Sequence, residues 1–218
     1  MARFFLVVVM LFAATAVAQP APPSKRLADL THFQGTWTCT GKAFASPWMP
    51  EHPKVATIHV DWVLGGYFLN AVWVERKTAS NPCPAAGHVY WGYDEQTKKF
   101  VGWAADNFGA NGPIASTGWE GDTIVWTGSF TVNGVTINTR DKFVRKSAKQ
   151  IDHTTEADMS GTWTLLNQET CMKKHDHHVH AATVRKARRV AGCMAWVMRA
   201  RSAEETAADG RQPPLLFA

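Results

Sequence analysis

Apolar positions recur with the short period of β-strands between residues 27 and 174, and turn residues interrupt them at regular intervals. Alternation of apolar and polar side chains is typical of strands that bury one face. The turn signals follow one another at about 8 to 12 residues, the spacing found in all-β sandwiches and barrels. We therefore predict ten strands, at 35–40, 55–64, 67–76, 88–93, 100–106, 115–119, 123–127, 135–145, 150–157 and 162–171.

Turn chemistry supports the connections between these strands. Gly65 and Gly66 can adopt positive φ without steric cost, so the segment around them is interpreted as a tight hairpin. Segment 120–122 carries a similar signal, and 94–98 is interpreted as a longer polar loop. Successive hairpins make a meander, and closing the meander removes its two unpaired edges. We predict a single antiparallel up-and-down β-barrel with a short entry helix at 27–33.

The N-terminal residues have the order of a secretory signal peptide. A basic residue, Arg3, precedes the apolar run 4–12, and small residues lead to a cleavage site expected after Ala18. The run is shorter than the about 20 residues that a spanning helix needs. We predict a signal peptide at 1–18, a disordered proline-rich leader at 19–26, and a mature protein that is periplasmic or secreted and has no transmembrane segment.

Barrel closure and an oxidising compartment together predict a disulfide. The first and last strands of an up-and-down barrel are neighbours, and they carry Cys39 and Cys171. Disulfides persist outside the cytosol, and the four cysteines form no CxxC pair typical of zinc sites. We predict a Cys39–Cys171 bond and leave the pairing of Cys83 and Cys193 open.

The C-terminal segment differs in composition from the predicted barrel at 27–174. Residues 175–218 are rich in His and Arg, and the apolar positions around Val184 fall at helical spacing. We interpret this segment as a basic extension that is disordered or helical, and we predict no metal site in its histidine cluster. The chain has a formal net charge of +5, much of it in this extension, and we predict no nucleic-acid partner.

Five segments carry a resemblance to a known family. They are FQGTWTCTG, DWVLGGYFL, GYDEQTKKFVGWAADNFG, STGWEGDTIVWTG and GTWTLLNQETCMKK. In this order they resemble the bacterial domain-of-unknown-function family 1579, over residues 33–174. The resemblance implies a small calycin-like barrel, of the lipocalin and fatty-acid-binding-protein kind, and an exported location. It implies no established chemistry. The G-x-W of the first strand is a more distant likeness to nitrobindin-type haem proteins, but no histidine matches their iron ligand.

Aromatic residues on the predicted strands are the candidates for a binding site. The chain has ten tryptophans, and tryptophan combines a large apolar area with one N–H donor. We expect a barrel interior that binds a small apolar or amphipathic molecule. The candidate ligand-binding residues are Trp73, Trp91, Trp103, Asp106, Trp126 and Arg140, with Arg140 as the anchor for a carboxylate.

Two other interpretations stay open at this stage. The same tryptophans suit a structural or interaction protein whose barrel is filled with side chains. A haem-binding or enzymatic barrel would use His59 or His153, since imidazole titrates near neutral pH. We find no catalytic motif and predict no catalytic residue, no metal and no cofactor. The sequence predicts neither the ligand's identity nor the oligomeric state.

Overall fold

The computed structural model describes residues 21–174, except 48 and 133. The predicted signal peptide, the C-terminal extension and Cys193 lie outside the described residues. Within these residues, we find no helix with the length and apolar character needed to cross a bilayer.

The elements are two short 3₁₀ helices and eleven strands. They are η1 (Lys25–Phe33), β1 (Gly35–Ala43), β2 (His52–Val63), η2 (Leu64–Gly66), β3 (Phe68–Glu75), β4 (Ala86–Asp94), β5 (Lys99–Asp106), β6 (Asn111–Ser116), β7 (Trp119–Glu120), β8 (Thr123–Val132), β9 (Val135–Ser147), β10 (Gln150–Met159) and β11 (Thr162–Lys173).

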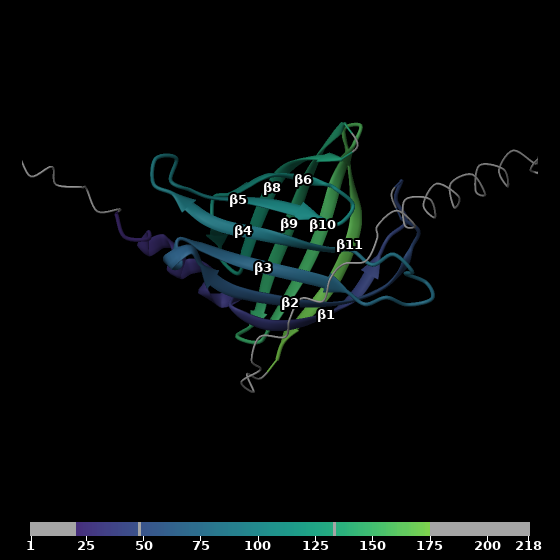
Figure 1. Ribbon diagram of the computed structural model, residues 1–218, viewed down its shortest axis with the longest axis horizontal. Helices are drawn as coiled ribbons and strands as arrows, with labels where there is room; N and C mark the ends of the chain where they lie inside the picture. Colours follow the sequence, from purple (N-terminus) through teal and green to yellow (C-terminus); the bar gives the residue numbers. More distant parts are fainter. Residues whose placement is uncertain (1–20, 48, 133, 175–218) are drawn as a thin grey trace, which may run out of the picture.

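All the pairings between these strands are antiparallel, and they close into a barrel, as predicted. The order β6-β5-β4-β3-β2-β1-β11-β10-β9-β8 is closed by a further pairing of β6 with β8. The first and last strands, β1 and β11, are neighbours. Figure 1 shows β1 to β5 crossing in front of the steeper β8 to β11. The two-residue β7 pairs only with β8 and stands outside the closed ring.

The predicted strands match the observed ones with one main difference. The segment predicted as one strand at 115–119 is divided between β6 and β7. Gly118 has φ of +103°, a backbone conformation that breaks a continuous strand. The hairpin predicted at Gly65 and Gly66 is present, and φ is positive at both residues.

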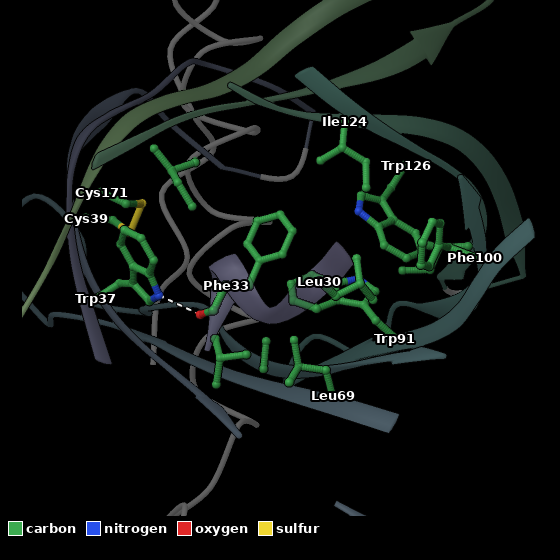
Figure 2. Packing of buried hydrophobic residues seen from close by; sticks show 14 of the residues in the cluster. Leu30, Phe33, Trp37, Cys39, Leu69, Trp91, Phe100, Ile124, Trp126 and Cys171 are labelled. Atoms are coloured by element: carbon green, nitrogen blue, oxygen red, sulfur yellow. Dashed lines mark hydrogen bonds between the residues drawn. A yellow bond between two sulfur atoms is a disulfide. The ribbon is translucent and has the colours of Figure 1, made fainter. Parts of the chain in front are cut away.

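The helix η1 covers one end of the barrel. Its apolar residues Leu27, Leu30 and Phe33 are three positions apart, and a 3₁₀ helix has three residues per turn, so they share one face. All three are buried, which stabilises the fold by about 1.5 to 3 kcal/mol for each side chain. Figure 2 shows Phe33 and Leu30 projecting among the inward side chains of the strands.

The Cys39–Cys171 disulfide is present, which confirms the prediction. The two residues are direct cross-strand partners on β1 and β11, and both are buried. Their bond closes a loop with a sequence separation of 132 residues. It joins the first and last strands of the described barrel beside the aromatic core, where Trp37 Nε1 donates to Phe33 O at 2.7 Å.

Candidate functional site

Inward side chains form two layers of different chemistry. The layer next to η1 is apolar and largely aromatic (Figure 2). The layer toward the opposite end contains charged residues from β2, β3, β9, β10 and β11. We call these charged residues the polar cluster. Its members are Lys54, Glu75, Asp141, His153 and Glu169.

His153 lies between two carboxylates of the polar cluster. Its Nδ1 is 2.8 Å from Glu169 Oε1, and its Nε2 is 3.0 Å from Asp141 Oδ1. Burial disfavours the charged ring, but the hydrogen bonds to Asp141 and Glu169 outweigh this and raise the pKa of His153. Because carboxylates only accept, the geometry fits an imidazolium that donates from both nitrogens.

Lys54 and Glu169 meet across β1 because the residue between them is Gly41. Both are register partners of Gly41, which therefore lies beneath their contact. A Cβ atom at Gly41 would lie 2.8 Å from Glu169 Cβ, so a larger residue would collide there. Lys54 Nζ is 3.3 Å from Glu169 Oε1. Burial raises the pKa of Glu169, but Lys54 and His153 together lower it to about 2.

Glu75 connects the polar cluster to the loop between β3 and β4. Its Oε1 is 3.6 Å from Lys54 Nζ. Its Oε2 accepts hydrogen bonds from Asn81 Nδ2 at 3.0 Å and from the Ala85 amide at 3.1 Å. Both oxygens of Glu75 therefore have partners, and the loop is held against the interior.

The polar cluster has more negative than positive formal charges. Three carboxylates face Lys54 and His153, so the cluster carries a net negative charge even when His153 is protonated. Lys54, Glu75 and Glu169 are each less than 10% exposed. The side chains of His153 and Asp141 are 11% and 27% exposed, so the four most buried members balance when His153 is protonated, and the excess negative charge lies on the partly exposed Asp141.

The aromatic layer and the polar cluster are in direct contact. The rings of Phe143 and His153 are stacked, with centroids 4.2 Å apart. The Trp91 ring lies 6.3 Å from Phe143 and 5.6 Å from Trp126. Trp126 is also the cross-strand partner of Asp141. The interior is thus amphipathic, with indole rings at one side and carboxylates at the other.

Several buried polar atoms of inward-facing side chains have no hydrogen-bond partner among the described residues. Buried polar atoms in folded proteins are nearly always hydrogen-bonded, and exceptions call for a water or a ligand. The atoms are Trp91 Nε1, Trp126 Nε1, His52 Nε2, Thr139 Oγ1, Asn167 Oδ1 and Glu169 Oε2. The indole nitrogens are donors, whereas the carboxylate and amide oxygens are acceptors.

Glu169 also lies beside the disulfide. One ligand atom from each of Glu169, Cys39 and Cys171 lies within 4.8 Å of the others. The two sulfur atoms are bonded to each other, so neither is the thiolate that binds a metal ion. The group therefore does not act as a metal site while the bond is intact.

The four tryptophans predicted to bind the ligand lie on both faces of the sheet. Trp91 and Trp126 point inward and are 5% and 1% exposed. Trp73 also points inward, and its ring covers Gly87, where a Cβ would lie 2.2 Å from the indole. Trp103 lies on the outer face and is 49% exposed. Three of the four candidate tryptophans therefore lie inside the barrel.

Arg140 and Asp106 have partners that do not belong to the polar cluster. Arg140 points outward, forms an ion pair with Glu156 and lies over the Trp163 ring at 4.4 Å. Asp106 accepts from the amides of Phe108 and Ala110 and so stabilises the loop after β5. Burial raises the pKa of Asp106, against these hydrogen bonds. The structure places neither side chain among the members of the polar cluster.

The two candidate histidines occupy different faces of the barrel. His59 is on the outer face, where its Nε2 is 2.6 Å from Asp61 and its Nδ1 is 3.0 Å from the Thr36 hydroxyl. His153 is inside the barrel. The structure therefore brings only His153 into the candidate site.

Four members of the polar cluster were missed by the sequence reasoning. Lys54 is in phase with the buried Ala56 and Val60 in the strand HPKVATIHVDW, and this parity predicts an inward lysine. Glu169 is similarly in phase with Cys171, which barrel closure places inside. The alternation that places both residues inside can be seen in the sequence. The contact between Lys54 and Glu169 depends in addition on the register of three strands.

Comparisons with known proteins agree with the fold and name no activity. The model of a family described as a protein of unknown function (DUF1579) matches residues 22–155. Among solved structures, the chain is similar to the crystal structure of Rv2717c from M. tuberculosis. The TM-score is 0.55 and the identity 12%, over 70% of this chain and 99% of that one. At this identity the likeness shows the fold alone. The comparison with curated proteins gave no match.

Proposed function

This chain belongs to the DUF1579 family of proteins of unknown function, and we propose that it binds a small amphipathic molecule inside its barrel. The observation that carries the proposal is the set of unpartnered polar atoms in the interior. Trp126 and Glu169 are 1% and 3% exposed, yet each has a polar atom without a hydrogen-bond partner among the described residues. Each such atom costs about 1 to 3 kcal/mol if it stays unpaired, which favours an occupant that supplies partners.

The arrangement of the interior indicates how such a ligand would be oriented. Leu30 and Phe33 already fill the part of the barrel next to η1, with 0% and 3% exposure. The ligand therefore belongs in the polar half, with its apolar part against the rings of Trp91 and Trp126 and an acceptor atom within reach of their unpartnered N–H groups. Its polar part would then face Glu169. This favours a compact amphipathic molecule over a long apolar chain.

The proposal is tested with protein purified from its own host. Native mass spectrometry is expected to show a bound small molecule that is lost on denaturation. Tryptophan fluorescence of the stripped protein, titrated with fatty acids, isoprenoids, haem and small aromatic molecules, is expected to change at micromolar concentrations of the ligand that fits.

Two tryptophan substitutions locate the binding event. Trp126→Phe removes an interior indole, and Trp103→Phe removes one that is 49% exposed on the outer face. Binding inside the barrel predicts that the fluorescence change shrinks in Trp126→Phe and persists in Trp103→Phe. The proposal fails if no ligand accompanies the native protein and no member of the panel alters the fluorescence. That outcome would instead favour a barrel filled by its own side chains.

We also propose that the protein acts outside the cytosol. A disulfide between β1 and β11 persists in an oxidising compartment. Mass spectrometry of the N-terminus, with the protein isolated from periplasm and medium, is expected to show cleavage after Ala18. Recovery of the uncleaved chain from the cytosol would contradict this.

A further inference from the structure

We infer that the polar end of the ligand is a protonated amine, which binds beside Glu169 in the half of the barrel away from η1. This inference rests on the proposed function and specifies the ligand class for the same site. Three observations carry it. They are the kind of atoms that lack partners, the positions of these atoms around β1, and the net charge of the polar cluster.

The unpartnered atoms on β2 and β11 are all acceptors. Glu169 Oε1 accepts from Lys54 and His153, but its Oε2 is buried without a partner among the described residues. Asn167 Oδ1, two residues earlier on the same inward face, is also buried without a partner. Only a donor can satisfy such oxygens, and an ammonium group offers three N–H donors.

His52 supplies a third acceptor. Its Nδ1 lies 2.9 Å from the carbonyl oxygen of Pro50, which can only accept, so Nδ1 carries the hydrogen. The neutral ring then has a lone pair on Nε2. This atom is buried without a partner among the described residues, and His52 is 3% exposed.

The register places these acceptors around two small residues of β1. Ala43 pairs with His52 on one side and with Asn167 on the other. Gly41, on the same inward face of β1, pairs with Glu169. The backbones of His52 and Asn167 are two strand spacings apart, about 10 Å, and both residues lie on the inward face of the sheet. Gly41 makes room for the contact of Lys54 with Glu169, and the ligand group would bind next to that contact, toward Glu169 Oε2 and Asn167 Oδ1.

The charge of the cluster favours a cation over a neutral donor. Three carboxylates of the polar cluster face two cations, so one negative charge is uncompensated. A carboxylate ligand would add a second negative charge beside Glu169, whereas an ammonium group would neutralise the cluster. Asp141 is 27% exposed and partly screened by solvent, so this charge adds to the preference for a donor that the unpartnered acceptors set.

The test compares three probes with the same phenylethyl group. They are 2-phenylethylammonium, 2-phenylethanol and 3-phenylpropionate, and their binding is measured at pH 7 by calorimetry and tryptophan fluorescence. The ammonium probe is expected to bind at least roughly 10-fold more tightly than the alcohol, with the carboxylate weakest. Glu169→Gln is expected to weaken the ammonium probe by roughly 10- to 100-fold and the alcohol much less, because a charged acceptor is lost.

Controls separate the site from general effects of the substitution. Glu156→Gln makes the same chemical change on the outer face, where Glu156 pairs with Arg140, and is expected to leave the affinity of every probe unchanged. If Glu169→Gln does not fold, Asn167→Leu removes a neighbouring acceptor without changing the charge. It is expected to weaken the ammonium probe as well.

The outcomes distinguish this inference from the proposed function. If the alcohol or the carboxylate binds as tightly as the ammonium probe, the amine inference is wrong and a barrel that binds small molecules remains. The same holds if all three probes fail while another ligand binds inside the barrel. If no molecule of either set binds, both fail. An affinity for the ammonium probe that Glu169→Gln and Asn167→Leu leave unchanged also overturns the inference.

Discussion

Acidification is expected to destabilise this protein through Glu169. The pKa of this carboxyl group is lowered from 4.5 to about 2 in the folded state, mainly by Lys54 and His153 acting against burial. The unfolded chain therefore binds a proton at higher pH than the folded chain does. The resulting stability is fully present above about pH 4.5 and is lost as the pH falls toward about 2.

The magnitude follows from the size of the shift. The difference between the two pKa values of Glu169 corresponds to about 3 kcal/mol of folding free energy. About 2 kcal/mol of this is lost by pH 3. Glu169 is 3% exposed, so solvent does not screen its interactions as it screens a surface ion pair.

The assay is urea unfolding followed by tryptophan fluorescence at pH 6, 4.5 and 3, with the disulfide intact. Glu169→Gln cannot lose this proton-linked stability, so its difference from the wild type is expected to shrink by about 2 kcal/mol between pH 6 and pH 3. Glu156→Gln serves as the control, because Glu156 pairs with Arg140 on the outer face and its contribution is screened. Equal pH dependence in Glu169→Gln and the wild type would refute the reasoning.

The remaining predictions concern stability at alkaline pH, the disulfide, the close packing at Gly41 and the outer face of the barrel. The pKa of His153 is raised, so its stabilisation is complete below about pH 6.5 and falls as the pH rises through the folded value; unfolding at pH 6 and pH 9 checks the sign, and a gain in stability would contradict it. The double variant Cys39→Ala/Cys171→Ala is expected to lose up to about 5 kcal/mol, from the loop of 132 residues, and an unchanged urea midpoint would oppose this. Gly41→Ala places a Cβ 2.0 Å from a main-chain oxygen of β11 and is expected to lower the free energy of unfolding by about 3 kcal/mol, measured by thermal unfolding. If the variant is as stable as the wild type, β1 and β11 can move apart at little cost. Trp103→Ser is expected to change ligand affinity by no more than about twofold, and a larger loss would place the ligand outside the barrel.

The fold was predictable because its signals are local. Alternation within single strands and glycines at positive φ, such as Gly65, specify strands and hairpins without knowledge of distant residues. The disulfide was predictable for a related reason, since closure makes the first and last strands neighbours whatever the details of the register. Cys39 and Cys171 needed only to lie on those two strands.

The candidate site was harder to predict because it depends on register and on the choice of the inward face. Trp91 and Trp103 lie on adjacent strands, one inside and one outside, and both faces of that hairpin carry aromatic rings. Composition alone therefore could not distinguish the tryptophans inside the barrel from those on its outer face. Lys54 and Glu169 meet only because both are paired with Gly41, and their separation of 115 residues leaves no local trace of this.

Stability alone gives a weak reason for the polar cluster. A buried ion pair is often no more stabilising than apolar residues of similar volume, and it becomes destabilising when a charge lacks a partner. The barrel already has an aromatic layer, an end covered by η1 and a disulfide between its first and last strands. A cluster with excess negative charge and an unpartnered oxygen on Glu169 is better explained by an occupant that supplies the missing charge and hydrogen bonds. Removal of the bound amine from the native protein should therefore lower its stability at pH 7. If the polar cluster is only structural, the same treatment would leave the stability unchanged.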